Sequence, residues 1–85
     1  MVEVKKMAKQ MVKLTFPQEL IKEPVTFKMA KKYDIIPNIR RARVSETVGE
    51  IVLELEGKKE NLDKGIKYLE KRNVKVEPIV GDIVE

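Results

Sequence analysis

Two alternating runs joined by a turn occupy residues 38–57, which read NIRRARVSETVGEIVLELEG. The second run, from Ile51 to Glu56, alternates core-type apolar residues with mostly acidic ones, as expected for a strand that has one face on a core and one in water. Ser45 and Gly49 are turn-forming residues between the two runs. We therefore predict that two antiparallel strands form a central hairpin and that the rest of the fold is built around it.

The first run of this hairpin does not alternate cleanly. Ile39 lies on the opposite parity from Ala42 and Val44, so one residue too many separates the two halves of the pattern. A β-bulge near Arg40 and Arg41 would return all three apolar residues to one face. We predict such a bulge.

The remaining segments alternate between strand and helix patterns. The run before Pro17 alternates like a strand, and a helical pattern follows Pro24. A second helical pattern follows Gly57 and is expected to end at Asn73, as a left-handed cap. A last short strand follows Asn73. The order strand, helix, strand, strand, helix, strand predicts a ferredoxin-like βαββαβ fold of the α+β class, with a four-stranded antiparallel sheet and both helices on one face. We expect a flexible segment at 1–9, the domain at 10–78 and a tail at 79–85.

Composition limits the class of protein. Eighty-five residues form one small domain with a marginal core, which makes a homodimer a reasonable expectation. No apolar run is long enough to span a bilayer and no signal-peptide core is present, so we expect a cytoplasmic protein with no membrane contact. Charged residues make up 38% of the chain, a balance that resembles thermophile proteins.

The sequence contains no arrangement of residues suited to catalysis. Cysteine and histidine are both absent, which removes thiolate and imidazole nucleophiles, bases and metal ligands. The four glycines are isolated, so no phosphate-binding glycine loop is formed. We therefore expect neither an enzyme nor a cofactor nor a metal site.

Positive charge is concentrated in the first half of the chain. Residues 1–43 hold eleven Lys and Arg against four acids, whereas residues 44–85 hold seven against ten. This asymmetry fits a basic face for an anionic partner, complementary surfaces for self-association, or an ordinary solvated surface. The fold also occurs in RNA-recognition domains, but those stack bases on aromatic residues of the central strands. Here the third strand has no aromatic residue and presents acids outward, so we do not expect nucleic-acid binding.

Four stretches of the sequence resemble the NIL domain, across about residues 10–78. They are LTFPQELIKEPV, KKYDIIPNI, VGEIVLELEG and YLEKRNVKVE. The family is ferredoxin-like, is related to the ACT amino-acid-sensing domains, and takes its name from an Asn-Ile-Leu motif at the start of the second strand. In this chain the motif reads Asn38-Ile39-Arg40, so the third position differs.

The resemblance implies a small-molecule-binding regulatory role. NIL domains are best known at the C-terminus of the ATPase subunit of methionine-import ABC transporters, where they dimerise and bind methionine to inhibit transport; others are fused to a 4Fe-4S ferredoxin. Lacking an ATPase part and cysteines, this chain is expected to be a stand-alone form that senses methionine or a related sulfur amino acid at a dimer interface. The implied ligand-binding residues are Asn38, Ile39, Arg40, Thr15, Phe16 and Pro17.

Three alternatives remain open at the level of sequence. Asn38 either offers its side-chain amide to an amino acid or simply turns the chain after Pro37. Arg40 either pairs with a ligand carboxylate or indicates an altered methionine pocket, because a charged side chain stands where the family motif has an apolar leucine. The rival to a ligand sensor is a ligand-free interaction module that docks on a protein partner, such as a sulfur-metabolism enzyme or a ferredoxin.

Overall fold

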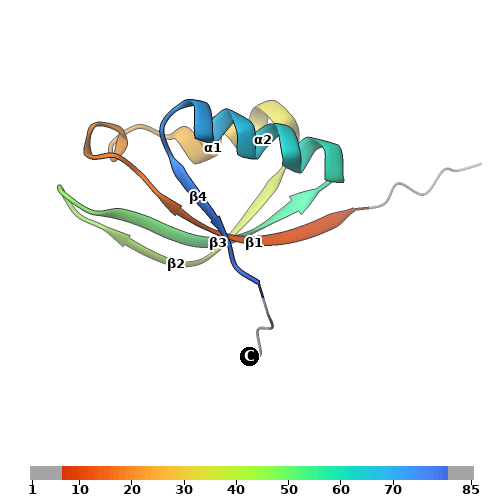
Figure 1. Ribbon diagram of the computed structural model, residues 1–85, viewed down its shortest axis with the longest axis horizontal. Coiled ribbons are helices and arrows are strands. Elements are labelled where there is room, and N and C mark those ends of the chain that lie inside the picture. The colour runs from red at the N-terminus through yellow and green to blue at the C-terminus, as the bar shows by residue number, and fades with distance from the viewer. Residues whose placement is uncertain (1–6, 81–85) are drawn as a thin grey trace, which may run out of the picture.

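Four antiparallel strands form one sheet, and two helices cover one of its faces (Figure 1). This computed structural model describes residues 7–80. The strand order is β2-β3-β1-β4, which confirms the predicted ferredoxin-like α+β fold. The elements are β1 (Ala8–Thr15), the short 3-10 helix η1 (Gln18–Leu20), α1 (Val25–Tyr33), β2 (Ile36–Val44), β3 (Gly49–Gly57), α2 (Lys59–Lys71) and β4 (Lys75–Pro78).

The core lies between the sheet and the helices. The two central strands place alternate residues there, so Leu53 of β3 stands opposite Val12 of β1 and both are fully buried. Each helix turns its apolar side chains toward this core, among them Met29 of α1 and Leu62 of α2. The buried apolar residues are Val12, Leu14, Val25, Met29, Ala30, Ile35, Leu53, Leu55, Leu62, Leu69 and Val74. No polar or charged residue within 7–80 is buried, so this core depends on apolar packing alone.

The hairpin β2–β3 has the predicted turn and the predicted bulge. The Ser45 hydroxyl accepts hydrogen bonds from the backbone N–H groups of Thr47 and Val48, at 3.2 and 3.1 Å, and closes the turn. The pairing register with β3 shifts between Ile39 and Arg41. Because of this shift, Ile39 and Val44 both lie on the helix-facing side of β2.

The two helices pack against each other through Gly65. A Cβ atom placed at this residue would lie 2.6 Å from Ile35 Cδ1 and 2.8 Å from Met29 Sδ. The glycine therefore admits side chains of α1 and of the connection that follows it. Each helix is followed by a residue in the left-handed region, Asp34 at φ 57° and Asn73 at φ 69°, and the second of these confirms the predicted cap.

The first strand is longer than its sequence pattern indicated. It begins at Ala8, and Ala8 and Lys9 pair with Gly57 and Glu56 of β3. The strand therefore takes in the last two residues of the expected flexible segment at 1–9. Backbone pairing with a neighbouring strand does not need an alternating pattern of side chains. Residues 1–6 lie outside the described part. Of the expected tail, Ile79 donates its N–H to the Met11 carbonyl at 2.9 Å, and residues 81–85 lie outside the described part.

Candidate functional site

The motif residues lie at the start of β2, the strand at one edge of the sheet. Asn38 is half-buried and stands opposite Glu54 on the sheet face that the helices leave open. Arg40 forms an ion pair with the same Glu54 at 3.6 Å. Ile39 points to the other side and is 59% exposed. Among residues 7–80 the Asn38 side chain makes no hydrogen bond, so its amide is available to a ligand.

The other predicted site residues lie at the far end of the sheet. Thr15 ends β1 opposite Glu50, and Phe16 and Pro17 follow it in the loop that leads to α1. Met11 is the β1 residue opposite Glu54, so about four residues, or roughly 13 Å of strand, separate the two groups along the sheet. One chain therefore does not bring Asn38 together with Thr15, Phe16 and Pro17.

A small apolar cavity opens beside Phe16, beneath the loop between β1 and α1. Its volume is about 160 Å³, close to that of a cavity that holds one benzene molecule. It accommodates one apolar side chain and is too small for a whole drug-sized ligand. The wall residues are Phe16, Leu20, Ile21, Glu23, Pro24, Val25, Thr26, Phe27, Val44, Gly49 and Ile51. Of these, sequence reasoning had singled out only Phe16 as a site residue, because a cavity between a loop and a hairpin leaves no periodic signal.

Thr26 brings an unsatisfied polar group to this cavity. Its hydroxyl oxygen is buried and has no hydrogen-bonding partner among residues 7–80. A buried hydroxyl without a partner lowers stability, since its hydrogen bonds to water are lost on folding.

Replacing Thr26 by valine is therefore expected to stabilise the free protein. Valine keeps the shape and removes the unpaired hydroxyl, which should raise the free energy of unfolding by about 1 kcal/mol. Urea titration measures the change. Thr47→Val, in the exposed turn between β2 and β3, is the matched control and should change stability by less than about 0.5 kcal/mol. A loss of stability in Thr26→Val would mean that the hydroxyl is satisfied in solution.

Exposed apolar side chains line the same side of the molecule. Phe27 on α1 is 64% exposed, and Ile39 and Val44 on the helix-facing side of β2 are 59% and 61% exposed. The helices leave β2 uncovered, and the β2–β3 hairpin extends past them in Figure 1. An edge strand with this much exposed apolar surface is typical of a surface that another molecule covers.

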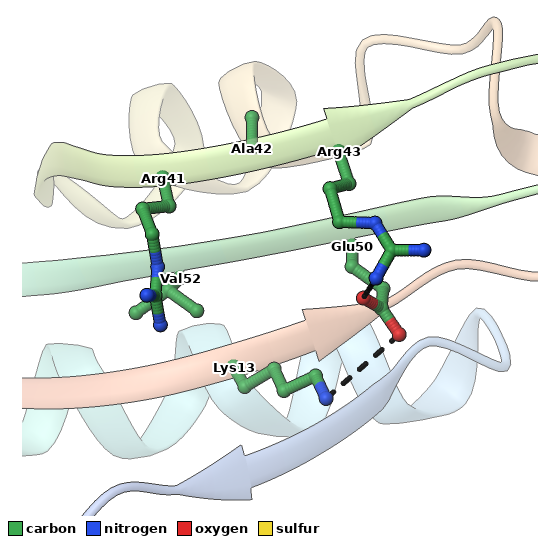
Figure 2. A pocket seen from close by; sticks show the side chains of 6 residues that line it. All are labelled: Lys13, Arg41, Ala42, Arg43, Glu50 and Val52. Carbon is green, nitrogen blue, oxygen red and sulfur yellow. Dashed lines mark ion pairs between the residues drawn. The ribbon is translucent and has the colours of Figure 1, made fainter.

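The open face of the sheet is charged and carries a second, larger depression. Figure 2 shows Arg41 and Arg43 of β2 pointing to this face, over Glu50 and Val52 of β3 and toward Lys13 of β1, while Ala42 points to the opposite face. We call this depression the basic basin; its volume is about 630 Å³, and it is lined by Lys13, Arg41, Ala42, Arg43, Glu50 and Val52. Glu50 forms ion pairs with Arg43 at 3.6 Å and with Lys13 at 3.8 Å. The period-2 pattern of each strand indicates these faces, but only the pairing register brings Lys13 and Arg41 into one row.

Neither a carboxylate metal site nor a helix able to cross a membrane occurs in residues 7–80. Residues 7–80 contain no group of three or more carboxylate side chains able to hold a metal ion; histidine and cysteine do not occur in the sequence. No helix in this range has the length and apolar character needed to cross a membrane.

Comparison with known proteins identifies a family and solved structures with a similar fold. Residues 10–78 match the family model of the NIL domain. The fold is similar to the crystal structure of the C-terminal domain of an ABC transporter ATP-binding protein from Enterococcus faecalis, with a TM-score of 0.76 and 26% sequence identity. That similarity covers 86% of this chain and 86% of the other. No curated protein gives a sequence match.

Proposed function

Since the chain belongs to the NIL domain family, we propose that it is a non-enzymatic regulatory domain that binds methionine or a related sulfur amino acid at the interface of a homodimer. Methionine is the ligand implied by the family resemblance. The structural similarity to the C-terminal domain of an ABC transporter ATP-binding protein supports a regulatory role. The observation that carries the proposal is the accessible Asn38 amide at an edge strand with exposed apolar side chains.

The separation of the predicted site residues supports a site made from two copies. Two chains placed antiparallel along β2 bring the Asn38 end of one strand next to the Val44 end of the other. The apolar cavity lies at that Val44 end, and it accepts one side chain of about the size of a methionine side chain. Asn38 of one copy then offers donor and acceptor groups to the amino acid's charged groups on the open face of the sheet. The apolar end of the ligand passes between the two β2 strands toward the partner's cavity, which lies on the helix-facing side.

Contact along β2 is expected to use side chains more than backbone pairing. Pro37 has no N–H to donate and the bulge interrupts the strand, and both features hinder continuous pairing at a sheet edge. The exposed side chains of Phe27, Ile39 and Val44 supply apolar area in its place. Arg40 reaches a ligand carboxylate only by leaving its 3.6 Å pair with Glu54.

A thermal-shift screen tests this proposal. At about 100 times its dissociation constant, methionine should add roughly 2.7 kcal/mol of stability and raise the unfolding midpoint by about 10–20 °C in a domain of this size. The screen should include the other amino acids, homocysteine and S-adenosylmethionine. Asn38→Ala should abolish the shift, and Asn61→Ala on α2 should keep it.

The solution mass must be measured beside the screen. A dimer whose mass is retained in Asn38→Ala, together with a selective shift in the unmodified protein, supports a ligand site between two copies. A midpoint that no amino acid moves at millimolar concentration contradicts the proposal. In that case the exposed apolar flank of β2 and α1 favours the second candidate function, a docking module for a protein partner.

A further inference from the structure

The basic basin lies in the middle of the uncovered sheet face, away from the apolar cavity. Arg41, Val52 and Lys13 form one row across three neighbouring strands. Neighbouring strands are about 4.8 Å apart, so the backbones of Arg41 and Lys13 are separated by roughly 10 Å. Both side chains are long enough to bring their charges to a common point above Val52. The basin is therefore a place where cations from β1 and β2 can come together.

The charges of the basin are not balanced within it. Three cationic side chains surround the carboxylate of Glu50, the one acidic group of the lining. Glu77 of β4, opposite Lys13, is paired with Lys75. The lining therefore has an excess of two positive charges. The ion pairs of Glu50 with Lys13 and Arg43 are 3.8 and 3.6 Å long, whereas a strong charge-assisted hydrogen bond is about 2.7–2.9 Å. Among residues 7–80 Arg41 forms no ion pair. An incoming anion can therefore contact Arg41 and share Lys13 and Arg43 with Glu50.

We propose that the basic basin binds a small phosphorylated ligand, a phosphate monoester whose anionic group contacts Arg41, Arg43 and Lys13. A phosphate monoester carries about −1.5 to −2 charges at neutral pH, which matches the local excess, whereas a carboxylate carries one. Guanidinium groups bind phosphate oxygens through paired N–H donors. The volume of about 630 Å³ is within the range of small-molecule sites and leaves room for an organic group over the apolar floor formed by Val52.

The acidic residues of the same face argue for a small ligand over a nucleic acid. Glu54 and Glu56 continue along β3 beyond the basin, and Glu77 of β4 stands opposite Lys13. A phosphate chain that continued past the basin would approach these carboxylates, which would repel it. One phosphate group above Val52 avoids them.

Titration of isotope-labelled protein followed by NMR tests the proposal. Inorganic phosphate, AMP and acetate are added separately at constant ionic strength, and the first two probes separate binding of the phosphate group from binding of an organic body. AMP is expected to saturate at one molecule per chain, with amide shifts concentrated at residues 13, 41–43 and 50–52. Acetate should give no saturable shift.

Charge-matched variants separate a site from general attraction. Arg41→Gln/Arg43→Gln should weaken AMP binding by about tenfold or more. Lys64→Gln/Lys67→Gln removes two exposed cations from α2 and should leave AMP affinity within about twofold. Glu50→Gln removes the competing carboxylate and should strengthen AMP binding several-fold, while Glu60→Gln on α2 should not. Asn38→Ala should bind AMP normally, which keeps this test independent of the amino-acid site.

Three results would overturn the proposal. The first is that neither inorganic phosphate nor AMP binds saturably at concentrations up to roughly 10 mM, so that any dissociation constant would be weaker than this value. The second is equal weakening of AMP binding in the two double variants, which would indicate non-specific attraction. The third is binding of an oligonucleotide without binding of AMP, which would assign the face to nucleic acid.

Discussion

Replacing Leu53 by alanine is expected to destabilise the protein by about 3–4 kcal/mol. Leu53 is fully buried in the middle of β3, opposite Val12 on one side and Ile39 on the other. The substitution removes apolar contacts and leaves a cavity that the two neighbouring strands cannot fill without moving. A domain of 85 residues has roughly 4–13 kcal/mol of stability in total, so this loss is a large share of it.

The preceding residue of the same strand, Val52, is the matched control. Val52 points to the open face and is half-buried there, in the floor of the basic basin. Val52→Ala should cost less than about 1 kcal/mol, because most of its lost contacts are replaced by water. Urea unfolding followed by circular dichroism measures both variants. Equal losses would mean that both faces of β3 are covered in solution, as they would be if a second copy packed on the open face.

Replacing Gly65 by valine is the second large effect expected, with a loss of about 2–3 kcal/mol. The added side chain would begin 2.6 Å from Ile35 Cδ1 and 2.8 Å from Met29 Sδ. These are the ends of flexible side chains, but Ile35 and Met29 are both buried and enclosed by the core. They have no free space to enter, so α1 and α2 must move apart and lose apolar contact.

The alanine variant at the same position separates packing from helix propensity. Gly65→Ala gains about 1 kcal/mol of helix propensity while still adding a Cβ atom at the crowded point, so its loss should be smaller than that of valine. Lys64→Val, at an exposed position of the same helix, should cost less than about 1 kcal/mol. Thermal unfolding of the three variants measures the order. A Gly65→Val protein as stable as the unmodified one would contradict close packing of the helices at this residue.

Most of the fold could be predicted because its signals are local. The alternation from Ile51 to Glu56 indicated which face of β3 is buried, and the parity change at Ile39 indicated a bulge, which the register shift between Ile39 and Arg41 confirms. The start of β1 at Ala8 was missed because its pairing with β3 is made by the backbone and leaves no trace in the side-chain pattern.

The candidate site was less accessible to the same reasoning. Asn38, Ile39 and Arg40 were found through a short motif, and Thr15, Phe16 and Pro17 through the resemblance that accompanies it; their role stays a prediction. The cavity beside Phe16 also needs Thr26, Phe27 and Val44, which come from three separate segments. Their proximity depends on how the loop after β1 folds over the hairpin.

By itself the sequence determined the element order, the apolar and polar faces of the strands, the left-handed cap at Asn73 and the lack of histidine and cysteine chemistry. These properties depend on neighbouring residues or on composition alone. The tertiary structure decided that Gly65 admits α1, that the two halves of the predicted site lie at opposite ends of the sheet, and that Lys13 joins Arg41 and Arg43 around Glu50. These depend on strand register and helix packing, which join residues far apart in the chain and so leave no periodic trace in it.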